Sequence, residues 1–148
     1  MVRTLNAPCE KRPTASTDMS DDARLLDSSV VIRHFRQGGE ISSRLETFSA
    51  LYLPSIALGE LYTGAQRSAR PAKNLAQVEE FIAGITLITV DDETSRHYGR
   101  VSAQLAAAGR PIPHNDMWIA ACAMQWGLTV ATSDEHYKRI DGLSCEMW

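Results

Sequence analysis

The sequence predicts a single α/β domain, an α/β/α sandwich in which helices cover both faces of a central parallel sheet. From Ala23 onward, short apolar runs alternate with segments whose apolar residues recur at helical spacing. That alternation is typical of parallel strands joined by crossover helices. The chain has 148 residues, of which 44% are hydrophobic and 22% are charged. This is enough to build one α/β core and too little to build two.

Five strands are expected where short apolar runs meet turn residues, at residues 24–27, 51–53, 85–90, 128–131 and 143–147. The first strand is followed by a helix that stops at Gly38 and Gly39, and a second helix covers residues 41–49. After the second strand, Pro54 starts another helix, with Ser55 as its expected N-cap.

Proline and glycine bound the helices of the second half. Pro71 opens a helix and Gly84 closes it, because proline suits the first helical turn and glycine the residue after the last one. A long helix then ends at Gly109, and the last helix spans residues 115–126 and ends at Gly127.

Residues 1–22 are expected to be a flexible leader, and residues 23–148 to form the folded domain. The leader is rich in proline, serine, threonine and aspartate, which form turns and have little apolar surface to bury. Met19 is an alternative start of translation, and the sequence leaves that choice open.

No stretch resembles a secretory signal or approaches the roughly 20 apolar residues that span a bilayer. A cytoplasmic protein without a membrane partner is therefore expected. The three cysteines, Cys9, Cys122 and Cys145, are widely spaced and form no C-x-x-C motif, as expected of thiols in a reducing compartment. The net charge of −3 argues neither for nor against nucleic-acid binding.

Four carboxylates, from Asp27, Glu60, Asp116 and Asp134, are placed where they can converge. Asp27 and Asp134 follow predicted strands, and ligands bind beyond the carboxyl ends of parallel strands. Asp116 lies in the first turn of a helix that runs back from the same edge. Glu60 lies about five residues into its helix, roughly 7 Å from the start, and its side chain leans towards the helix N-terminus. Carboxylates without accompanying sulfur ligands favour Mg²⁺ or Mn²⁺ over zinc.

Each acid also has a simpler interpretation. Asp116 can complement a helix dipole, and Glu60 can be a solvated glutamate. Asp27 can cap the following helix, and Asp134 can be an ordinary turn residue. Against this, Asp116 shares a helix face with Ile119 and Ala120, where an unpaired acid is costly. The convergence of all four favours a functional site.

The segments that carry these acids resemble the motifs of PIN-domain ribonucleases, and in size and order most closely those of VapC-type toxins. The matching segments are LLDSS at residues 25–29, ELYTG at 60–64, NDMWIAA at 115–121 and TSDEHY at 132–137. Tyr137 stands where phenylalanine is common, and Ser29 where asparagine is common. The likeness covers about residues 24–148 and keeps all four acids.

The resemblance implies a PIN-like α/β/α domain that cleaves single-stranded RNA with Mg²⁺ or Mn²⁺. It implies that Asp27 and Asp116 hold the metal and that Glu60 and Asp134 complete a catalytic pocket. Hydroxyl and amide groups of Ser28, Asn115 and Thr132 are expected to hold the acids in place. The implied partners are the RNA substrate, a cognate antitoxin protein and a second copy of the chain in a homodimer.

The four histidines show no metal-binding spacing, so no zinc site is expected; they are His34, His97, His114 and His136. Arg33 and Arg36 either contact RNA phosphate or form a solvated helix face. A phosphatase of the haloacid type needs a second aspartate two residues after Asp27, where Ser29 stands. A phosphoacceptor receiver domain needs an acidic pair at that strand end, which is also missing. The remaining alternative is a non-catalytic PIN-like module that binds RNA or protein.

Overall fold

The computed structural model describes residues 21–148. The expected leader, apart from Asp21 and Asp22, lies outside the described residues, as does the alternative start at Met19. Asp22 already contacts the domain, because its carbonyl accepts a hydrogen bond from the Ser49 amide at 3.0 Å. Within the described part, no helix combines the length and the apolar character needed to cross a membrane.

A five-stranded parallel sheet forms the centre of the molecule, with the strand order β3-β2-β1-β4-β5. The strands are β1 (Ala23–Leu26), β2 (Ala50–Pro54), β3 (Thr86–Ile88), β4 (Thr129–Thr132) and β5 (Cys145–Met147). The predicted strands and the parallel sheet are thus confirmed. Strand β3 is shorter than the predicted run of residues 85–90. It lies at the edge of the sheet, and Leu87 and Val90 are exposed there.

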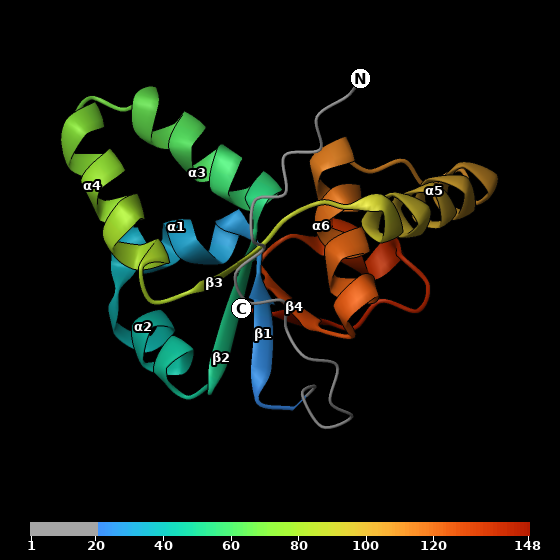
Figure 1. Cartoon of the computed structure of the whole chain (residues 1–148), viewed down its shortest axis with the longest axis horizontal. Helices are drawn as coiled ribbons and strands as arrows, with labels where there is room; N and C mark the ends of the chain where they lie inside the picture. Colours follow the sequence, from blue (N-terminus) through green and yellow to red (C-terminus); the bar gives the residue numbers. More distant parts are fainter. Residues whose placement is uncertain (1–20) are drawn as a thin grey trace, which may run out of the picture.

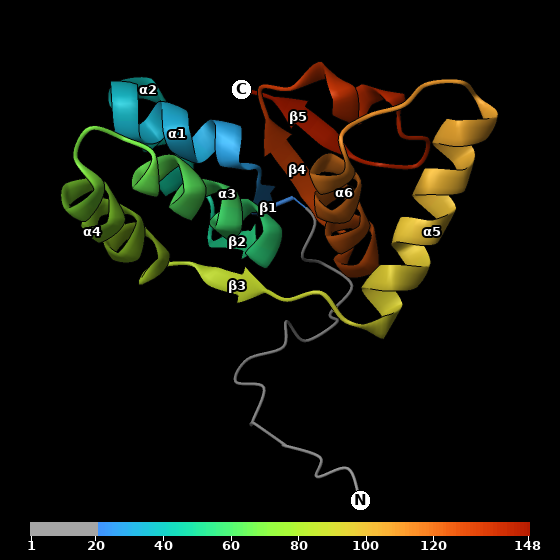
Figure 2. The same ribbon diagram turned by 90° about the horizontal axis from the view of Figure 1, so that it is seen from above.

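Helices cover both faces of the sheet, as predicted (Figures 1 and 2). One face carries α1 (Ser28–Gln37), α2 (Gly39–Glu46), α3 (Ser55–Gln66) and α4 (Pro71–Ile82). The other carries α5 (Asp92–Ala107) and α6 (His114–Trp126), and the 3-10 helix η1 (Glu135–Arg139) joins β4 to β5. Ser55 is the first helical residue of α3 and Pro54 is its N-cap, so the expected cap at Ser55 is wrong.

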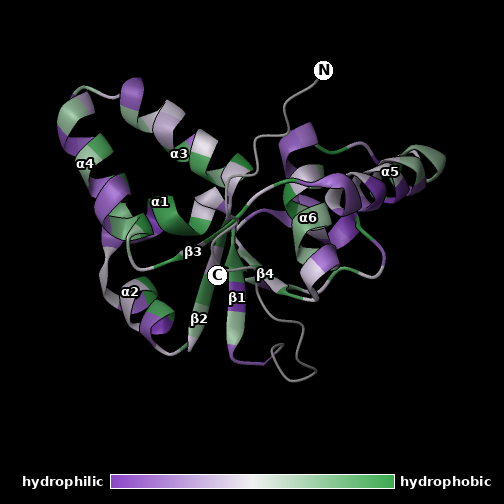
Figure 3. Cartoon of the chain, viewed as in Figure 1, coloured by the Kyte–Doolittle hydropathy of each residue, from purple (hydrophilic) through white to green (hydrophobic). Residues whose placement is uncertain are grey.

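The hydrophobic core lies between the sheet and these helices. Leu25, Leu53 and Val130 of the central strands are fully buried, as is Ile119 of α6. Hydrophobic residues follow the strands, while hydrophilic residues alternate with them along the outer helices (Figure 3). Helix α6 ends where Gly127 adopts a left-handed conformation at φ 64°, as the predicted glycine cap requires.

The strand order changes direction between the neighbouring strands β1 and β4, which form the topological switch point of the sheet. From β1 it moves outward through β2 to β3, then returns to β4 beside β1 and continues to β5. Adjacent strands whose connections leave in opposite directions open a crevice at their carboxyl ends, the usual place for a ligand in such sheets. Asp27 follows β1 at this point, and Thr132 ends β4.

Candidate active site

Asp27 is held rigidly at the end of β1 by neutral hydrogen-bond donors. It is only 4% exposed. Its Oδ1 accepts from the Ser28 amide at 2.9 Å, which caps α1. Its Oδ2 accepts from the hydroxyls of Ser29 and Thr132, both at 2.8 Å. Asp27 therefore does cap the following helix, but it is also fixed across the β1–β4 junction.

Glu60 is bound from two other elements. Its Oε2 accepts from the Ser28 hydroxyl at 2.8 Å, and its Oε1 accepts from the Asn115 amide nitrogen at 3.2 Å. Ser28 thus touches Asp27 through its backbone and Glu60 through its side chain. These bonds join α3 to the starts of α1 and α6. Ser28, Asn115 and Thr132 hold the acids in place, as predicted.

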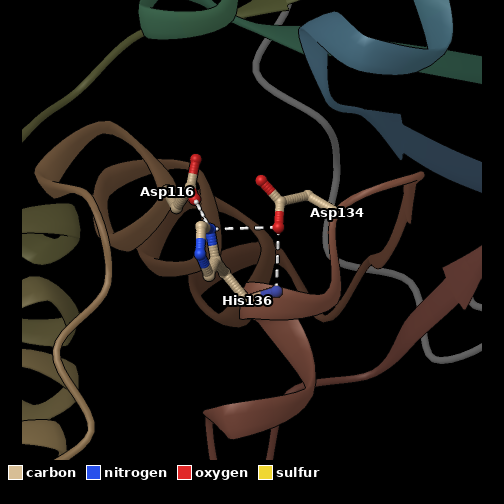
Figure 4. Close-up of side chains that lie close together, drawn as sticks. All are labelled: Asp116, Asp134 and His136. Atoms are coloured by element: carbon tan, nitrogen blue, oxygen red, sulfur yellow. Dashed lines mark hydrogen bonds and ion pairs between the residues drawn. The ribbon is translucent and has the colours of Figure 1, made fainter.

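Asp116 and Asp134 both contact the same ring nitrogen of His136 (Figure 4). His136 Nδ1 lies 3.1 Å from Asp116 Oδ2 and 3.0 Å from Asp134 Oδ1. Asp134 Oδ1 also accepts from the His136 backbone amide at 2.9 Å, which caps η1. The Asp134 amide in turn donates to Thr132 Oγ1 at 3.0 Å, so this group is connected to Asp27.

The four predicted acids are therefore tied into one hydrogen-bonded cluster at the carboxyl edge of the sheet. Two links are a shared serine and a shared threonine, and a third is the asparagine beside Asp116. Within residues 21–148, one group of potential metal ligands is formed by Asp116, Asp134 and His136, whose ligand atoms all lie within 4.8 Å of one another.

Burial and neighbouring negative charge both disfavour ionisation of Asp116 and of Tyr137. Burial raises the pKa of Asp116 to about 6; the hydrogen bond from His136 opposes this shift, and the charges of Asp27 and Asp134 add to it. Beneath the cluster, burial also raises the pKa of the Tyr137 hydroxyl, and the charges of Asp27, Asp116 and Glu60 act in the same direction. Excess negative charge of this kind is relieved by a bound cation.

The donor set fits a hard or borderline divalent ion. It offers carboxylate oxygens from several segments and one imidazole nitrogen, and none of the described cysteines lies in the cluster. Oxygen-rich sets of this kind suit Mg²⁺ and Mn²⁺.

Two residues of the cluster were not predicted from the sequence, His136 and Ser29. His136 shows no helical or motif spacing to another ligand, but it lies two residues after Asp134, a distance at which an aspartate commonly accepts from the backbone and turns the chain. Ser29 was noted only as a departure from the family pattern. It donates to Asp27 and accepts from the Ser133 amide at 3.1 Å. His114 bonds to the Tyr98 hydroxyl at 2.9 Å instead of to an acid.

Comparisons with known proteins agree with this fold. The family model of the PIN domain matches residues 24–143. Ribonuclease VapC2 of Haemophilus influenzae is 32% identical over 127 residues, which cover 84% of this chain and 96% of the relative. The tRNA(fMet)-specific endonuclease VapC of Shigella flexneri is 36% identical over 129 residues, with the same coverage.

Solved structures show the same architecture. The DNA-bound VapBC complex of Salmonella typhimurium contains a chain that superposes with a TM-score of 0.81 at 34% identity, covering 85% of this chain and 98% of that one. The promoter-bound VapBC2 complex of Rickettsia felis gives the same TM-score at 24% identity, which supports the fold alone. The chain belongs to the PIN-domain family and, within it, to the VapC ribonucleases, the toxin components of toxin–antitoxin pairs.

Proposed function

We propose that this VapC-family ribonuclease cuts single-stranded RNA as an Mg²⁺- or Mn²⁺-dependent endonuclease, with Asp27, Glu60, Asp116 and Asp134 as its catalytic acids. The observation that supports this most directly is their convergence from four separate segments into one bonded cluster at the carboxyl edge of the sheet. When bound there, the divalent ion supplies an activated water and neutralises charge on the phosphoryl oxygens.

We assign different roles to these residues according to their burial and hydrogen bonds. Asp27 and Asp116 are the proposed metal-binding acids, and both are buried. Glu60 on α3 and Asp134 in the turn after β4 are more exposed. They complete the acidic surface as further metal ligands, as hydrogen-bonding partners of the ligands or by orienting the water. Ser28, Asn115 and Thr132 keep the carboxylates in place through the hydrogen bonds described above.

A groove next to Glu60 supports a protein partner. It has a volume of about 410 Å³ and runs between α1, α3 and α4. Apolar residues such as Phe35 and Leu61 line it, together with the cations Arg36 and Lys73, and Glu60 is part of its wall. An extended arm with apolar side chains fits this lining. A basic side chain of the arm can reach the acids through Glu60. We propose that the cognate antitoxin binds here, as relatives are known in VapBC complexes.

We further propose that the toxin is a cytoplasmic homodimer, and that residues 23–148 are the nuclease domain and residues 1–22 a leader. The leader carries little apolar surface to contribute to a core. Removal of residues 1–19 is expected to leave thermal stability and RNA cleavage unchanged. A large fall in the melting temperature would place the domain boundary earlier in the chain.

The central test is cleavage of single-stranded RNA by the purified protein with and without MnCl₂. We expect metal-dependent cleavage by the wild type and none by Asp27→Ala. Asp92→Ala is a suitable control, because that carboxylate lies on α5 and is 81% exposed. Binding of RNA without cleavage by a folded wild type would support the alternative, a non-catalytic PIN-like module.

A further inference from the structure

Hydrogen bonding alone does not explain the position of the His136 imidazole in the acidic cluster. One nitrogen atom, Nδ1, faces carboxylate oxygens of two residues from different elements, Asp116 of α6 and Asp134 before η1. A neutral imidazole nitrogen carries a single proton or a single lone pair, so Nδ1 cannot make a full hydrogen bond to both oxygens. The His136 ring and the two carboxylates lie close enough together to be three ligands of one ion (Figure 4).

The two distances from Nδ1 match the separation of neighbouring ligands in a coordination shell. The two distances from Nδ1 to the carboxylate oxygens are 3.1 and 3.0 Å. Neighbouring ligands in an octahedral site with bonds of about 2.1 Å lie about 3 Å apart. The carboxyl group of Asp116 is largely buried, with 11% of its side chain exposed, whereas His136 and Asp134 are each about one-third exposed. The three groups therefore form a site with a closed base and an open side.

The backbone fixes the ring in this place. Asp134 Oδ1 accepts from the His136 amide at 2.9 Å, and the Asp134 amide donates to the buried Thr132 hydroxyl at 3.0 Å. These two bonds determine the course of the turn between β4 and η1. Because the turn is anchored to Thr132, the side chain of His136 is directed towards the carboxylates of Asp116 and Asp134.

On the basis of the proposed metal-dependent function, we propose that His136 Nδ1 is a direct nitrogen ligand of the divalent ion, beside Asp116 and Asp134. The consequence concerns metal choice. Mg²⁺ prefers an all-oxygen shell, whereas imidazole favours first-row transition ions. A site with one imidazole and several carboxylates therefore discriminates in favour of Mn²⁺, which accepts both ligand types, over Mg²⁺.

Mn²⁺ alone is a suitable probe, because electron spin-echo envelope modulation detects a nitrogen nucleus bound to it. We expect nitrogen modulation from Mn²⁺ bound to the wild type and its loss in His136→Gln. The matched control is His97→Gln, because His97 also faces a carboxylate, that of Glu93 at 3.7 Å, but lies on α5. This control is expected to keep the modulation.

Metal affinities provide a second readout. Titrations with Mn²⁺ and with Mg²⁺ measure the ratio of the Mn²⁺ affinity to the Mg²⁺ affinity. We expect this ratio to fall by about tenfold in His136→Gln, which is the order of loss seen when a group supporting a metal is removed. His136→Asp replaces the nitrogen by an oxygen donor. It is expected to bind both ions without nitrogen modulation, so the test remains valid if the glutamine variant fails to fold.

The outcomes separate this inference from the proposed function. Metal-dependent RNA cleavage by a wild type whose bound Mn²⁺ shows no nitrogen modulation would overturn the ligand role and leave the nuclease function standing. Modulation that persists in His136→Gln, or an unchanged affinity ratio, would also overturn it. A wild type that binds no Mn²⁺ and cleaves no RNA would overturn both.

Discussion

The acidic cluster has two halves that are built in different ways: one contains Asp27, and the other contains Asp116, Asp134 and His136. Asp27 is surrounded by neutral donors, and its two oxygens accept three hydrogen bonds from Ser28, Ser29 and Thr132. Asp116 is also buried, but its carboxylate has a single hydrogen-bonding side-chain partner, His136, in the part of the chain that is described. Burial raises its pKa to about 6. A carboxylate surrounded by donors is a fixed part of the structure, whereas one that is buried with few donors requires a cation for its full charge.

This difference predicts that the two aspartates fail differently when they are changed to asparagine. Both carboxylate oxygens of Asp27 accept hydrogen bonds, so in Asp27→Asn the amide NH₂ group must face a hydrogen-bond donor. The site therefore loses a metal-binding acid and a hydrogen-bond acceptor together. We expect RNA cleavage to fall by at least about 100-fold, the upper range for disrupted metal sites. Stability is expected to fall by about 1 kcal/mol through the weakened helix cap and hydrogen bonds.

Cleavage assays at saturating MnCl₂ and urea unfolding of the same preparations measure the two effects. Asp92→Asn is the matched control, because it changes an exposed acid near the start of α5. Wild-type cleavage by Asp27→Asn would remove Asp27 from the catalytic acids.

The hydroxyl of Thr132 connects the two halves, and its removal is expected to have the next largest effect. Thr132 is fully buried, donates to Asp27 and accepts from the Asp134 amide. Thr132→Val keeps the shape of the side chain but leaves both groups without this partner. We expect cleavage to fall by about tenfold and stability by about 1–2 kcal/mol.

Thr129→Val is the control for that experiment, because Thr129 begins the same strand away from the acids. If the two valine variants lose cleavage activity equally, the effect comes from the strand and not from the hydroxyl that joins Asp27 to the Asp134 turn.

The sequence predicted the four acids because their placement follows from general geometry. Strand ends and helix starts meet at one edge of a parallel sheet, so Asp27, Asp116 and Asp134 were placed there without knowledge of any contact. The contribution of His136 depends on the turn that the Asp134 side chain makes with its backbone amide, a contact between residues only two apart with no periodic signal. Ser29 was missed for a similar reason, since its hydroxyl completes a bond network across β1 and β4.

Local rules were also insufficient where tertiary packing decides the boundary. Ser55 has the chemistry of an N-cap, but the backbone of Pro54 is extended at φ −68° and ψ 144° and takes the capping position. Strand β3 ends at Ile88 because its one neighbour, β2, ends at Pro54, the residue paired with Ile88. Composition alone does not show which apolar run will lie at an edge.

Stability measurements as a function of pH would sharpen the contrast between the two aspartates. The pKa of Asp116 is about 6 in the folded state and 3.8 in the unfolded reference. Between these values the folded state binds more protons, so the stability contributed by the protonated carboxyl is complete below about pH 4 and is lost as pH rises through 6. At 1.36 kcal/mol per pKa unit, the full cost at neutral pH is at most about 3 kcal/mol.

In metal-free buffer, Asp116→Asn is therefore expected to be more stable than the wild type by about 1–2 kcal/mol at pH 7.5, with the difference shrinking towards pH 4. Chemical unfolding at both pH values in the presence of EDTA measures this. Asp27→Asn, which is expected to lose stability, provides the comparison. A destabilised Asp116→Asn at pH 7.5 would show that its contact with His136 outweighs the cost of burying the charge.

The smallest expected effect concerns the antitoxin, and it depends on which half of the cluster a partner's cation uses. An Arg or Lys from the antitoxin arm that reaches the acids is expected to replace the divalent ion, because both neutralise the same carboxylates. Raising MgCl₂ should then weaken the complex by a few-fold more than NaCl of equal ionic strength, which reports only general screening. Titration of the complex in the two salts measures the difference.

Asp116→Asn is expected to reduce this difference between the two salts, because that variant binds the ion poorly. Equal affinities in both salts would mean that the antitoxin inhibits by covering the groove beside Glu60 without filling the metal site.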